Sequence, residues 1–259
     1  MVFNTRDTHV GRSLDRYGEW VESELELLGP FLAPGDIVID AGANIGNHTV
    51  FFAERVGPEG RVYAFEPQRR VFQTLCANLV LNGLTSVEAL QAAVGAEPGS
   101  MAIPDVNYAA PGNFGGVRVA VGAGLQVPVI NLDSLGLTRC RAIKIDVEGM
   151  ELEVLNGAAA LIERTRPLLY VENNDRTKSG ALIRRLTGFG YQLFWHVSHY
   201  YNPNNFFANG QNVFGGLADA NMMCMPGSAE AIRSDTLMPV SGPDDHAEAA
   251  LTRLGPRSS

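Results

Sequence analysis

Cysteine is scarce in this chain of 259 residues, which has only Cys76, Cys140 and Cys224, far apart in the sequence. An odd and scattered set argues against a disulfide framework and against a paired zinc site, so we expect buried thiols. Long apolar runs are missing as well. No stretch reaches the roughly eighteen apolar residues of a membrane span, and residues 1–16 lack the apolar core of a secretion signal. We therefore expect a cytoplasmic protein with no membrane span.

Clusters of positive charge are also missing. The chain has 20 lysine and arginine residues against 28 aspartate and glutamate residues, a formal net charge of −8, and no long basic block. Proteins that hold nucleic acid or an anionic membrane need such a surface to neutralise phosphates, so we expect neither partner. With 46% hydrophobic and 19% charged residues, the composition is that of a globular protein and excludes a collagen-like or wholly disordered chain.

Short apolar runs alternate with amphipathic segments through most of the chain. We expect strands near 36–41, 61–66, 87–95, 141–147, 166–172 and 191–197, with helices at 47–57, 67–83, 148–163 and 179–190. Nearly continuous apolar strands separated by helices imply a parallel sheet that is covered on both faces. The predicted fold class is therefore a doubly wound α/β fold.

The length predicts one large domain with an appendage, at about 150 residues per domain. Residues 1–34 are expected to form an N-terminal helix or cap, with the helix at 14–33, and residues 35–226 the main domain. Within it, the glycine-rich and proline-interrupted segment 98–130 suits a hairpin insertion or lid. Residues 227–259 are expected to form a C-terminal tail, partly helical near 247–254.

Acidic residues stand at or just beyond the ends of the predicted parallel strands. Asp40 ends the first strand, Glu66 the second, Asp146 the fourth and Glu172 the fifth. The carboxyl ends of parallel strands meet at one edge, where open α/β sheets bind their ligands. We therefore expect one cleft to collect these carboxylates. Glu148, just beyond Asp146, would also suit a simple charge at the start of a helix.

The turn after the first strand contains Asp40, Gly42, Asn44 and Gly46. Its glycines would let the backbone approach a ligand, and amides at the start of the next helix would donate to an anionic group. The Gly-x-x-x-Gly spacing does not match the GxGxxG dinucleotide fingerprint. Glu66 can accept both hydroxyls of a ribose, whereas the surrounding carboxylates would repel a pyrophosphate. The pattern favours S-adenosylmethionine, which carries a sulfonium, over NAD.

The chain resembles the FkbM family of S-adenosylmethionine-dependent methyltransferases in VIDAGANIGNHTVFFA, VYAFEPQRRVFQTLCANLVLNG, LQAAVG, INLDSL and, most specifically, IKIDVEGMELEVLNGA. The resemblance covers about residues 17–226. It implies a class I, Rossmann-like, seven-stranded methyltransferase sheet with helices on both faces, in which a last strand near 220–226 inserts antiparallel at the edge. It also implies S-adenosylmethionine as cofactor and O-methylation of a sugar, a glycan or a natural product.

The resemblance assigns cofactor-binding roles residue by residue. Glu66 would hold the ribose, Gln91 and Ala92 would lie along the adenine, Asp146 would face the methionine amine or the transfer site, and Glu24 would close the pocket. The full expected set is Glu24, Asp40, Gly42, Asn44, Gly46, Thr49, Glu66, Gln91, Ala92 and Asp146, with His48 beside Thr49.

A hydroxyl acceptor must lose its proton during methyl transfer, so a base or a metal is expected. The candidate general bases are His196, His199, Glu172 and Asp146. A divalent cation held by Asp146, Glu172 and Asn173 would serve the same purpose, and these oxygen-rich ligands would suit magnesium. The sequence leaves both alternatives open.

The acceptor is expected to meet residues 196–214, which are dense in hydrogen-bonding and aromatic side chains. The expected contacts are Asn173, Asn174, Tyr201, Asn205 and Asn212, extended by Phe214. A small molecule or a glycan is the expected partner, and a homodimer is compatible with the sequence. Met222, Met223 and Met225 are expected to belong to the core of an edge strand.

Two other function classes remain to be weighed. A nicotinamide-dependent sugar oxidoreductase or epimerase would need the GxGxxG turn and usually a Tyr-x-x-x-Lys pair, and the sequence has neither. A non-catalytic nucleoside-binding scaffold would lack a polar acceptor pocket, which segment 196–214 argues against.

Overall fold

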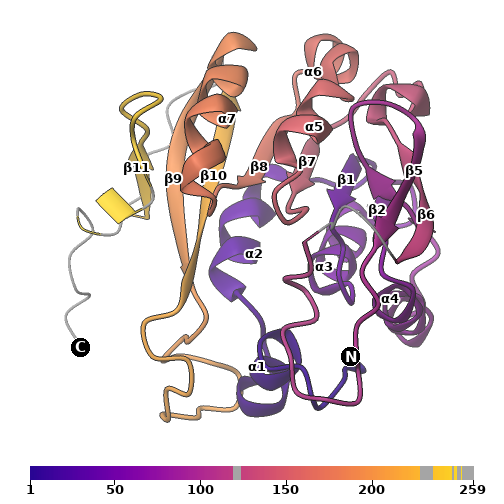
Figure 1. Ribbon diagram of the computed structural model, residues 1–259, viewed down its shortest axis with the longest axis vertical. Coiled ribbons are helices and arrows are strands. Elements are labelled where there is room, and N and C mark those ends of the chain that lie inside the picture. The colour runs from indigo at the N-terminus through magenta and orange to yellow at the C-terminus, as the bar shows by residue number, and fades with distance from the viewer. Residues whose placement is uncertain (119–123, 228–235, 247, 250–251, 253–259) are drawn as a thin grey trace.

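The computed structural model describes residues 1–118, 124–227, 236–246, 248, 249 and 252. Its main sheet consists of β1 (Ile37–Ala41), β2 (Arg61–Phe65), β3 (Val87–Leu90), β7 (Ala142–Ile145), β8 (Leu168–Glu172), β9 (Tyr191–His199), β10 (Ala218–Pro226) and β11 (Leu237–Pro239). The strand order is β11-β9-β10-β8-β7-β1-β2-β3 (Figure 1). From β8 to β3 every neighbouring pair is parallel, as the doubly wound α/β prediction requires.

Helices cover both faces of this sheet. They are α1 (Val10–Tyr17), α2 (Glu22–Leu28), α3 (Asn47–Val56), α4 (Arg69–Leu81), α5 (Glu151–Asn156), α6 (Ala159–Thr165) and α7 (Arg176–Gly188), with 3₁₀ turns η1 (Gly29–Phe31) and η2 (Leu132–Leu135). Successive strand residues point to opposite faces. Ile39 packs in the cluster that contains α5, α6 and α7, whereas Val38 packs with α2 and α3. The predicted two-sided cover is confirmed.

The prediction that the methionine-rich strand β10 lies at the edge of the sheet is wrong. It lies between β8 and β9 and is antiparallel to both. Met222, Met223 and Cys224 are fully buried, because Met222 and Cys224 pack in the cluster on one face of the sheet and Met223 packs in the cluster on the other. The edge is formed instead by β11, which pairs antiparallel with β9 and comes from the predicted tail. Within the described part of the chain the sheet therefore has eight strands, one more than expected.

Two predicted helices are each divided in two. The helix expected at 14–33 stops at Gly18, which has a φ of +77°, and resumes after Val21, which has a φ of +46°. The helix expected at 148–163 stops at Gly157, where a Cβ would strike the Gly95 carbonyl. One thiol also differs from expectation, since Cys76 is half-buried while Cys140 and Cys224 are buried.

The predicted insertion at 98–130 contains the expected hairpin. Its strands β5 (Gly99–Ile103) and β6 (Leu125–Ile130) pair antiparallel, and β4 (Ala93–Val94) adds to β6 as a second small sheet. The predicted strand 87–95 is thus shared between two sheets. The helix predicted near 247–254 falls mostly outside the described residues. Among the described helices, none has both the length and the apolar character that a membrane crossing requires.

Candidate functional site

The turn after β1 is shaped by contacts within the protein. Gly42 has a φ of +83°, and a Cβ there would overlap the Asp146 carbonyl at the end of β7. Gly46 has a φ of +97°, and its Cβ would meet Leu75 at 2.7 Å. The predicted reason for these glycines is the approach of a ligand. The structure shows a nearer cause, because neighbouring protein atoms already leave no room for a side chain.

Glu66 follows β2 and its carboxylate is held by two backbone amides. Asn44 N donates to Oε2 at 3.0 Å, and Gln68 N donates to Oε1 at 2.8 Å. Asn44 has a φ of +51°, a conformation that turns its amide onto this carboxylate. Burial raises the pKa of Glu66 to about 7, although the two amide hydrogen bonds oppose the shift. Glu66 is therefore a buried acceptor that its surroundings fix in place.

Lys144 is the main residue of the site that sequence reasoning missed. Its ammonium lies 3.2 Å from Asp146 Oδ2 and 3.6 Å from Asp40 Oδ1, and donates to the Gly42 carbonyl at 3.3 Å. Burial alone would lower its pKa, but Asp146 and Asp40 outweigh that effect and hold the pKa above its ordinary value. Lys144 thus stays charged beneath the turn. An isolated lysine inside the apolar strand AIKI was the available signal.

Glu24 reaches from α2 into a buried polar group under the cleft. It contacts His48 Nε2 at 2.9 Å and accepts a hydrogen bond from Asn221 Nδ2 at 2.9 Å. Although burial raises the pKa of Glu24, the hydrogen bond and charge of His48 outweigh it and lower the pKa. The prediction that Glu24 reaches the pocket is consistent with this position, since Glu24, His48 and Asn221 all line the cleft described below.

Three carboxylates gather beyond β7 and β8. Asp146, Glu148 and Glu172 have oxygen atoms within 4.8 Å of one another. Burial, followed by the charges of Asp146 and Asp219, raises the pKa of Glu148 to about 8. Burial and the charge of Asp146 raise the pKa of Glu172 well above its ordinary value. Glu148 and Glu172 therefore bind protons more strongly than ordinary carboxylates.

Asp219 stands beside this group, at the start of β10. It accepts hydrogen bonds from Tyr200 Oη at 2.9 Å and Asn174 Nδ2 at 3.0 Å. Burial raises the pKa of Asp219 to about 7. Sequence reasoning missed it because only the carboxyl ends of strands were considered. β10 runs antiparallel, so its first residues lie at the edge where the parallel strands end.

The three clustered carboxylates also have the spacing of ligands for a divalent cation. Asn173, which was predicted to complete such a set, instead donates from Nδ2 to Ser179 Oγ at 3.0 Å and lies near Met222 Sδ. The third residue of the group, beside Asp146 and Glu172, is Glu148 instead of Asn173. Oxygen donors of this kind suit a hard cation such as magnesium, so the set fits a cation chemically as well as it fits a proton acceptor.

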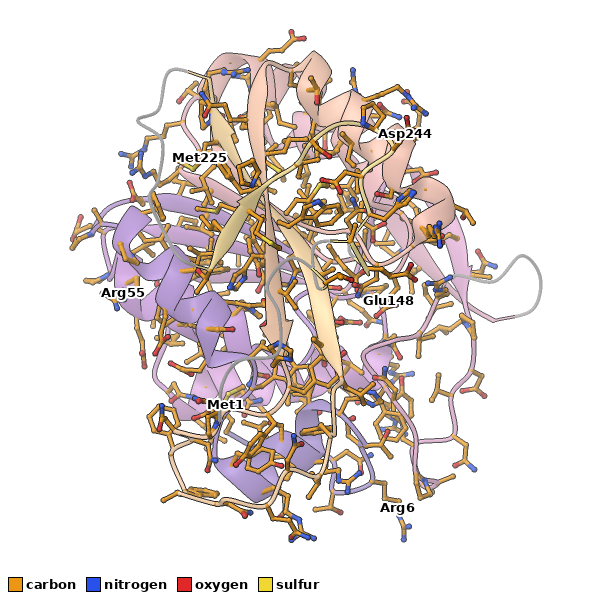
Figure 2. All side chains as sticks on the ribbon, turned by 90° about the vertical axis from the view of Figure 1, so that its left-hand side faces the viewer. Met1, Arg6, Arg55, Glu148, Met225 and Asp244 are labelled. Atoms are coloured by element: carbon orange, nitrogen blue, oxygen red, sulfur yellow. The ribbon has the colours of Figure 1, made fainter. Side chains whose placement is uncertain are left out.

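These elements enclose one cleft of about 1060 Å³, including its open mouth. Residues near α1, the segment between β5 and β6, and the loop after β9 contribute to it, and these three segments meet at the bottom of Figure 1. Figure 2 shows Glu148 near the middle of the view and Arg6 at its lower periphery. The acidic lining residues are Glu24, Glu66, Asp146, Glu148, Glu172 and Asp219. No lysine or arginine is found among the described residues that line it.

The wall of the cleft has an apolar part and an acidic part. Phe65, Ala92 and Ala93 form an apolar part of the wall next to Glu66, which suits an adenine beside its ribose. The carboxylates beyond it suit a sulfonium and an amine, because opposite charge stabilises both. Gly42, Asn44 and Asp146 line the cleft as predicted, while Asp40 and Thr49 lie below, with Thr49 Oγ1 donating to Asp40 Oδ2 at 2.6 Å.

Several predicted residues do not line the cleft. Gln91 and Gly46 are absent from its wall. His196 is buried in β9 with Nδ1 2.8 Å from Tyr170 Oη, and His199 is exposed at the strand end. A histidine base therefore stays a prediction, and the carboxylates that line the cleft are the better placed proton acceptors.

The loop after β9 contributes a neighbouring tyrosine rather than the predicted one. Tyr201 packs on Tyr17, and the amides of Asn205 and Asn212 bond within the loop. Tyr200 lines the cleft, with Trp20 at 4.7 Å between ring centroids. His9 packs edge-on against Tyr200 at 5.7 Å. These three rings, from distant parts of the sequence, form an aromatic wall that no local motif indicated. Asn174 is involved indirectly, through Glu172 and Asp219.

Comparisons with known proteins agree with this geometry. The family described as Methyltransferase FkbM domain matches residues 40–193. "Methyltransferase 1" of Beauveria bassiana (strain ARSEF 2860) is 32% identical over 155 residues, which cover 50% of this chain and 61% of that protein. "Methyltransferase sdnD" of Sordaria araneosa is 30% identical over 164 residues, covering 49% and 61%. The matches thus span about three fifths of the length of these curated relatives.

A solved structure gives the same architecture. The precorrin-6y C5,15-methyltransferase of Geobacter metallireducens GS-15 superposes with a TM-score of 0.52 at 12% identity, covering 80% of this chain and 87% of that one. At this identity the likeness concerns the fold alone, and it agrees with the class I methyltransferase fold that the sequence predicted.

Proposed function

Because the chain belongs to the FkbM family of S-adenosylmethionine-dependent methyltransferases, we propose that it transfers a methyl group from that donor to a hydroxyl of a sugar, a glycan or a natural product. The observation that carries the proposal is the position of Glu66. Its buried carboxylate follows β2, lines the cleft and adjoins an apolar wall. This arrangement suits the two hydroxyls and the base of a nucleoside.

In this scheme the residues of the chain bind, orient and remove a proton. S-adenosylmethionine supplies an electrophilic methyl group on its sulfonium. Glu66 binds the ribose and Asp146 faces the amine. Glu172, with Glu148 beside it, accepts the proton from the acceptor hydroxyl as the oxygen–methyl bond forms and S-adenosylhomocysteine leaves. A general base contributes about 10² to 10⁴ in rate, and the alignment of donor and acceptor contributes more.

The charge of the cleft supports an uncharged acceptor. Among the described residues, six acidic side chains line it, whereas Lys144 lies beneath the turn, outside the wall, and is paired with Asp40 and Asp146. Wherever these side chains are ionised, they would repel a carboxylate or phosphate on the acceptor. The aromatic wall of His9, Trp20 and Tyr200 offers an apolar ring surface, which suits the apolar face of a sugar or a macrocycle.

Calorimetry with S-adenosylhomocysteine tests the proposal. We expect the wild-type chain to bind it, Glu66→Gln to lose at least tenfold in affinity, and Glu88→Gln to bind normally. Glu88 is the matched control because it is exposed on the neighbouring strand β3. If the wild type has no affinity for S-adenosylhomocysteine but binds NAD, the nicotinamide-dependent alternative replaces the proposal.

A methyl-release assay separates the enzyme from the non-catalytic scaffold. The panel contains neutral glycosides, their uronic acid counterparts and macrolides, with release of S-adenosylhomocysteine as the signal. We expect turnover with a neutral member and none with its anionic counterpart. Binding of the cofactor without turnover of any member would favour the scaffold. The cytoplasmic location and a homodimeric assembly stay predictions.

A further inference from the structure

Residues 104–117, here called the cover segment, run between β5 and the part of the insertion that the structure leaves undescribed. The segment contains no helix or strand of its own. Asn113, Gly115, Gly116 and Val117 line the cleft. The segment lies beside the N-terminal residues and α1 in Figure 1. It is therefore one wall of the nucleoside part of the site, built without a regular element to hold it.

One margin of the cover segment is attached to the N-terminal residues. Thr8 N donates to the Gly112 carbonyl at 2.9 Å, and Gly112 N donates to the Arg6 carbonyl at 3.1 Å. Asn4 Nδ2 donates to the Tyr108 carbonyl at 3.0 Å. These bonds fix the outer margin and leave the cleft margin to other contacts.

The cleft margin is attached to Gln68. Its Nε2 donates to the Phe114 carbonyl at 2.8 Å, and its Oε1 accepts a hydrogen bond from Tyr108 Oη at 2.9 Å. Gln68 is buried, and the rings of Tyr108 and Phe114 pack together with centroids 4.9 Å apart. Both polar ends of one amide side chain are thus used to hold two points of the cover segment.

Gln68 is also bonded directly to the residue proposed to hold the ribose. Its backbone N–H donates to Glu66 Oε1, while Asn44 donates to Oε2. Asn44 touches the cover segment as well, since a Cβ on Gly115 would lie 2.6 Å from Asn44 Nδ2. Both residues that fix the Glu66 carboxylate are therefore in contact with the cover segment.

We propose that Gln68 is a positioning residue that fastens the cover segment over the nucleoside half of the bound donor, through Tyr108 and Phe114. This inference rests on the proposed function. Glu66 binds the ribose from one side, and Gln68 keeps the opposite wall closed over it. Loss of the fastening opens the route by which the nucleoside leaves. Dissociation of the ligand then accelerates more than association slows.

The test uses S-adenosylhomocysteine and 5′-methylthioadenosine as probes, with rates from stopped-flow or surface plasmon resonance. Tyr108→Phe removes one neutral hydrogen bond, so we expect affinity to fall about three- to tenfold, mainly through faster dissociation. Gln68→Met removes both hydrogen bonds, so its affinity should fall further. Both probes carry the nucleoside, so the affinities for the two probes should fall by the same factor.

A double-mutant cycle separates positioning from general destabilisation. If Tyr108 acts through Gln68, Tyr108→Phe should have no further effect in the Gln68→Met background, whereas independent destabilisation would add. Tyr191→Phe is the matched control. This substitution also removes a tyrosine hydroxyl, which donates a hydrogen bond to the Pro167 carbonyl at 2.7 Å. Tyr191 lies outside the cleft wall, so the dissociation rates of both probes should be unchanged.

Three outcomes would overturn the inference. The first is that Tyr108→Phe and Gln68→Met release the probes at the same rate as the wild type. The second is that the effects of the two substitutions add in the double variant. Either would leave the proposed function intact, since the wild type would still bind the probes. The third, no binding of either probe by the wild type, would remove the proposed function and this inference together.

Discussion

Lys144 and Asp40 form a fully enclosed ion pair, with Nζ and Oδ1 3.6 Å apart on neighbouring strands β7 and β1. Both side chains are almost without solvent exposure. The same ammonium contacts Asp146, which lines the cleft. Lys144 therefore links the carboxylate that supports the glycine turn to a carboxylate expected to face the donor.

Replacement of Lys144 by methionine should destabilise the protein strongly. It would leave Asp40 buried without a counter-charge, and the loss of one partner from a buried pair costs about 3–5 kcal/mol. The double variant Lys144→Met/Asp40→Asn should recover part of the free energy of unfolding, because no buried charge remains unpaired at position 40. Denaturant titration measures both. Equal stability of the single variant and the wild type would contradict this account of the pair.

Much of the site was predictable because its residues follow strands in the sequence. Asp40, Glu66, Asp146 and Glu172 were expected at one edge of the sheet, and three of them line the cleft while Asp40 supports it. The period of the apolar residues located the parallel strands, and parallel strands must end at the same edge. The sequence around one strand was sufficient to place these residues, because the location of each depends only on where its own strand ends.

Other parts depend on contacts between distant segments. Asp219 reaches the cleft because β10 inserts antiparallel between β8 and β9, and nothing within 218–226 shows which strands will flank it. Trp20 and Tyr200 meet across 180 residues of chain only after folding. Glu24 enters the cleft because the chain turns at Gly18 and Val21, where the sequence pattern predicted a continuous helix.

Cofactor affinity should fall as the solution becomes acidic. Burial raises the pKa of Glu66 to about 7, and the ionised carboxylate is the form that accepts two ribose hydroxyls. Below that pKa the protonated fraction grows, so affinity for S-adenosylhomocysteine should fall by up to about tenfold per pH unit. Calorimetry between pH 5 and 8 measures this. In Glu66→Gln the affinity should be weak and should depend less on pH across this window.

The raised pKa of Glu66 also determines how the stability of the folded protein changes with pH. A carboxyl group whose pKa is higher in the folded state than in the unfolded state favours folding in its protonated form. The contribution of Glu66 is therefore fully present below its unfolded pKa and is lost as the pH rises toward 7. Bound S-adenosylhomocysteine should raise the unfolding temperature most at pH 8, where Glu66 is ionised. A larger rise at pH 5 than at pH 8 would contradict this assignment.

Glu148 should illustrate a conflict between stability and function. Its φ is +55°, in a region that non-glycine residues adopt at a cost of about 1–2 kcal/mol, and its carboxyl lines the cleft. Glu148→Gly should therefore raise the free energy of unfolding by about 1 kcal/mol and lower the turnover. Glu148→Gln keeps the backbone cost and is the matched control. A fall in stability of the glycine variant would show that the side-chain contacts outweigh the strain.

Removal of divalent cations with EDTA distinguishes two roles for the carboxylates beyond β7 and β8, that of a proton acceptor and that of cation ligands. With Glu172 as the proton acceptor, turnover should be unchanged after dialysis against EDTA, and Glu172→Gln should lower it by about 10² to 10⁴ with S-adenosylhomocysteine affinity retained. The pKa of Glu172 lies well above its ordinary value, so turnover should rise with pH over a range higher than an ordinary carboxyl group would give. If EDTA abolishes turnover and magnesium restores it, then Asp146, Glu148 and Glu172 hold a cation that lowers the pKa of the acceptor hydroxyl. The carboxylates would then act as ligands, and the proton would leave by another route.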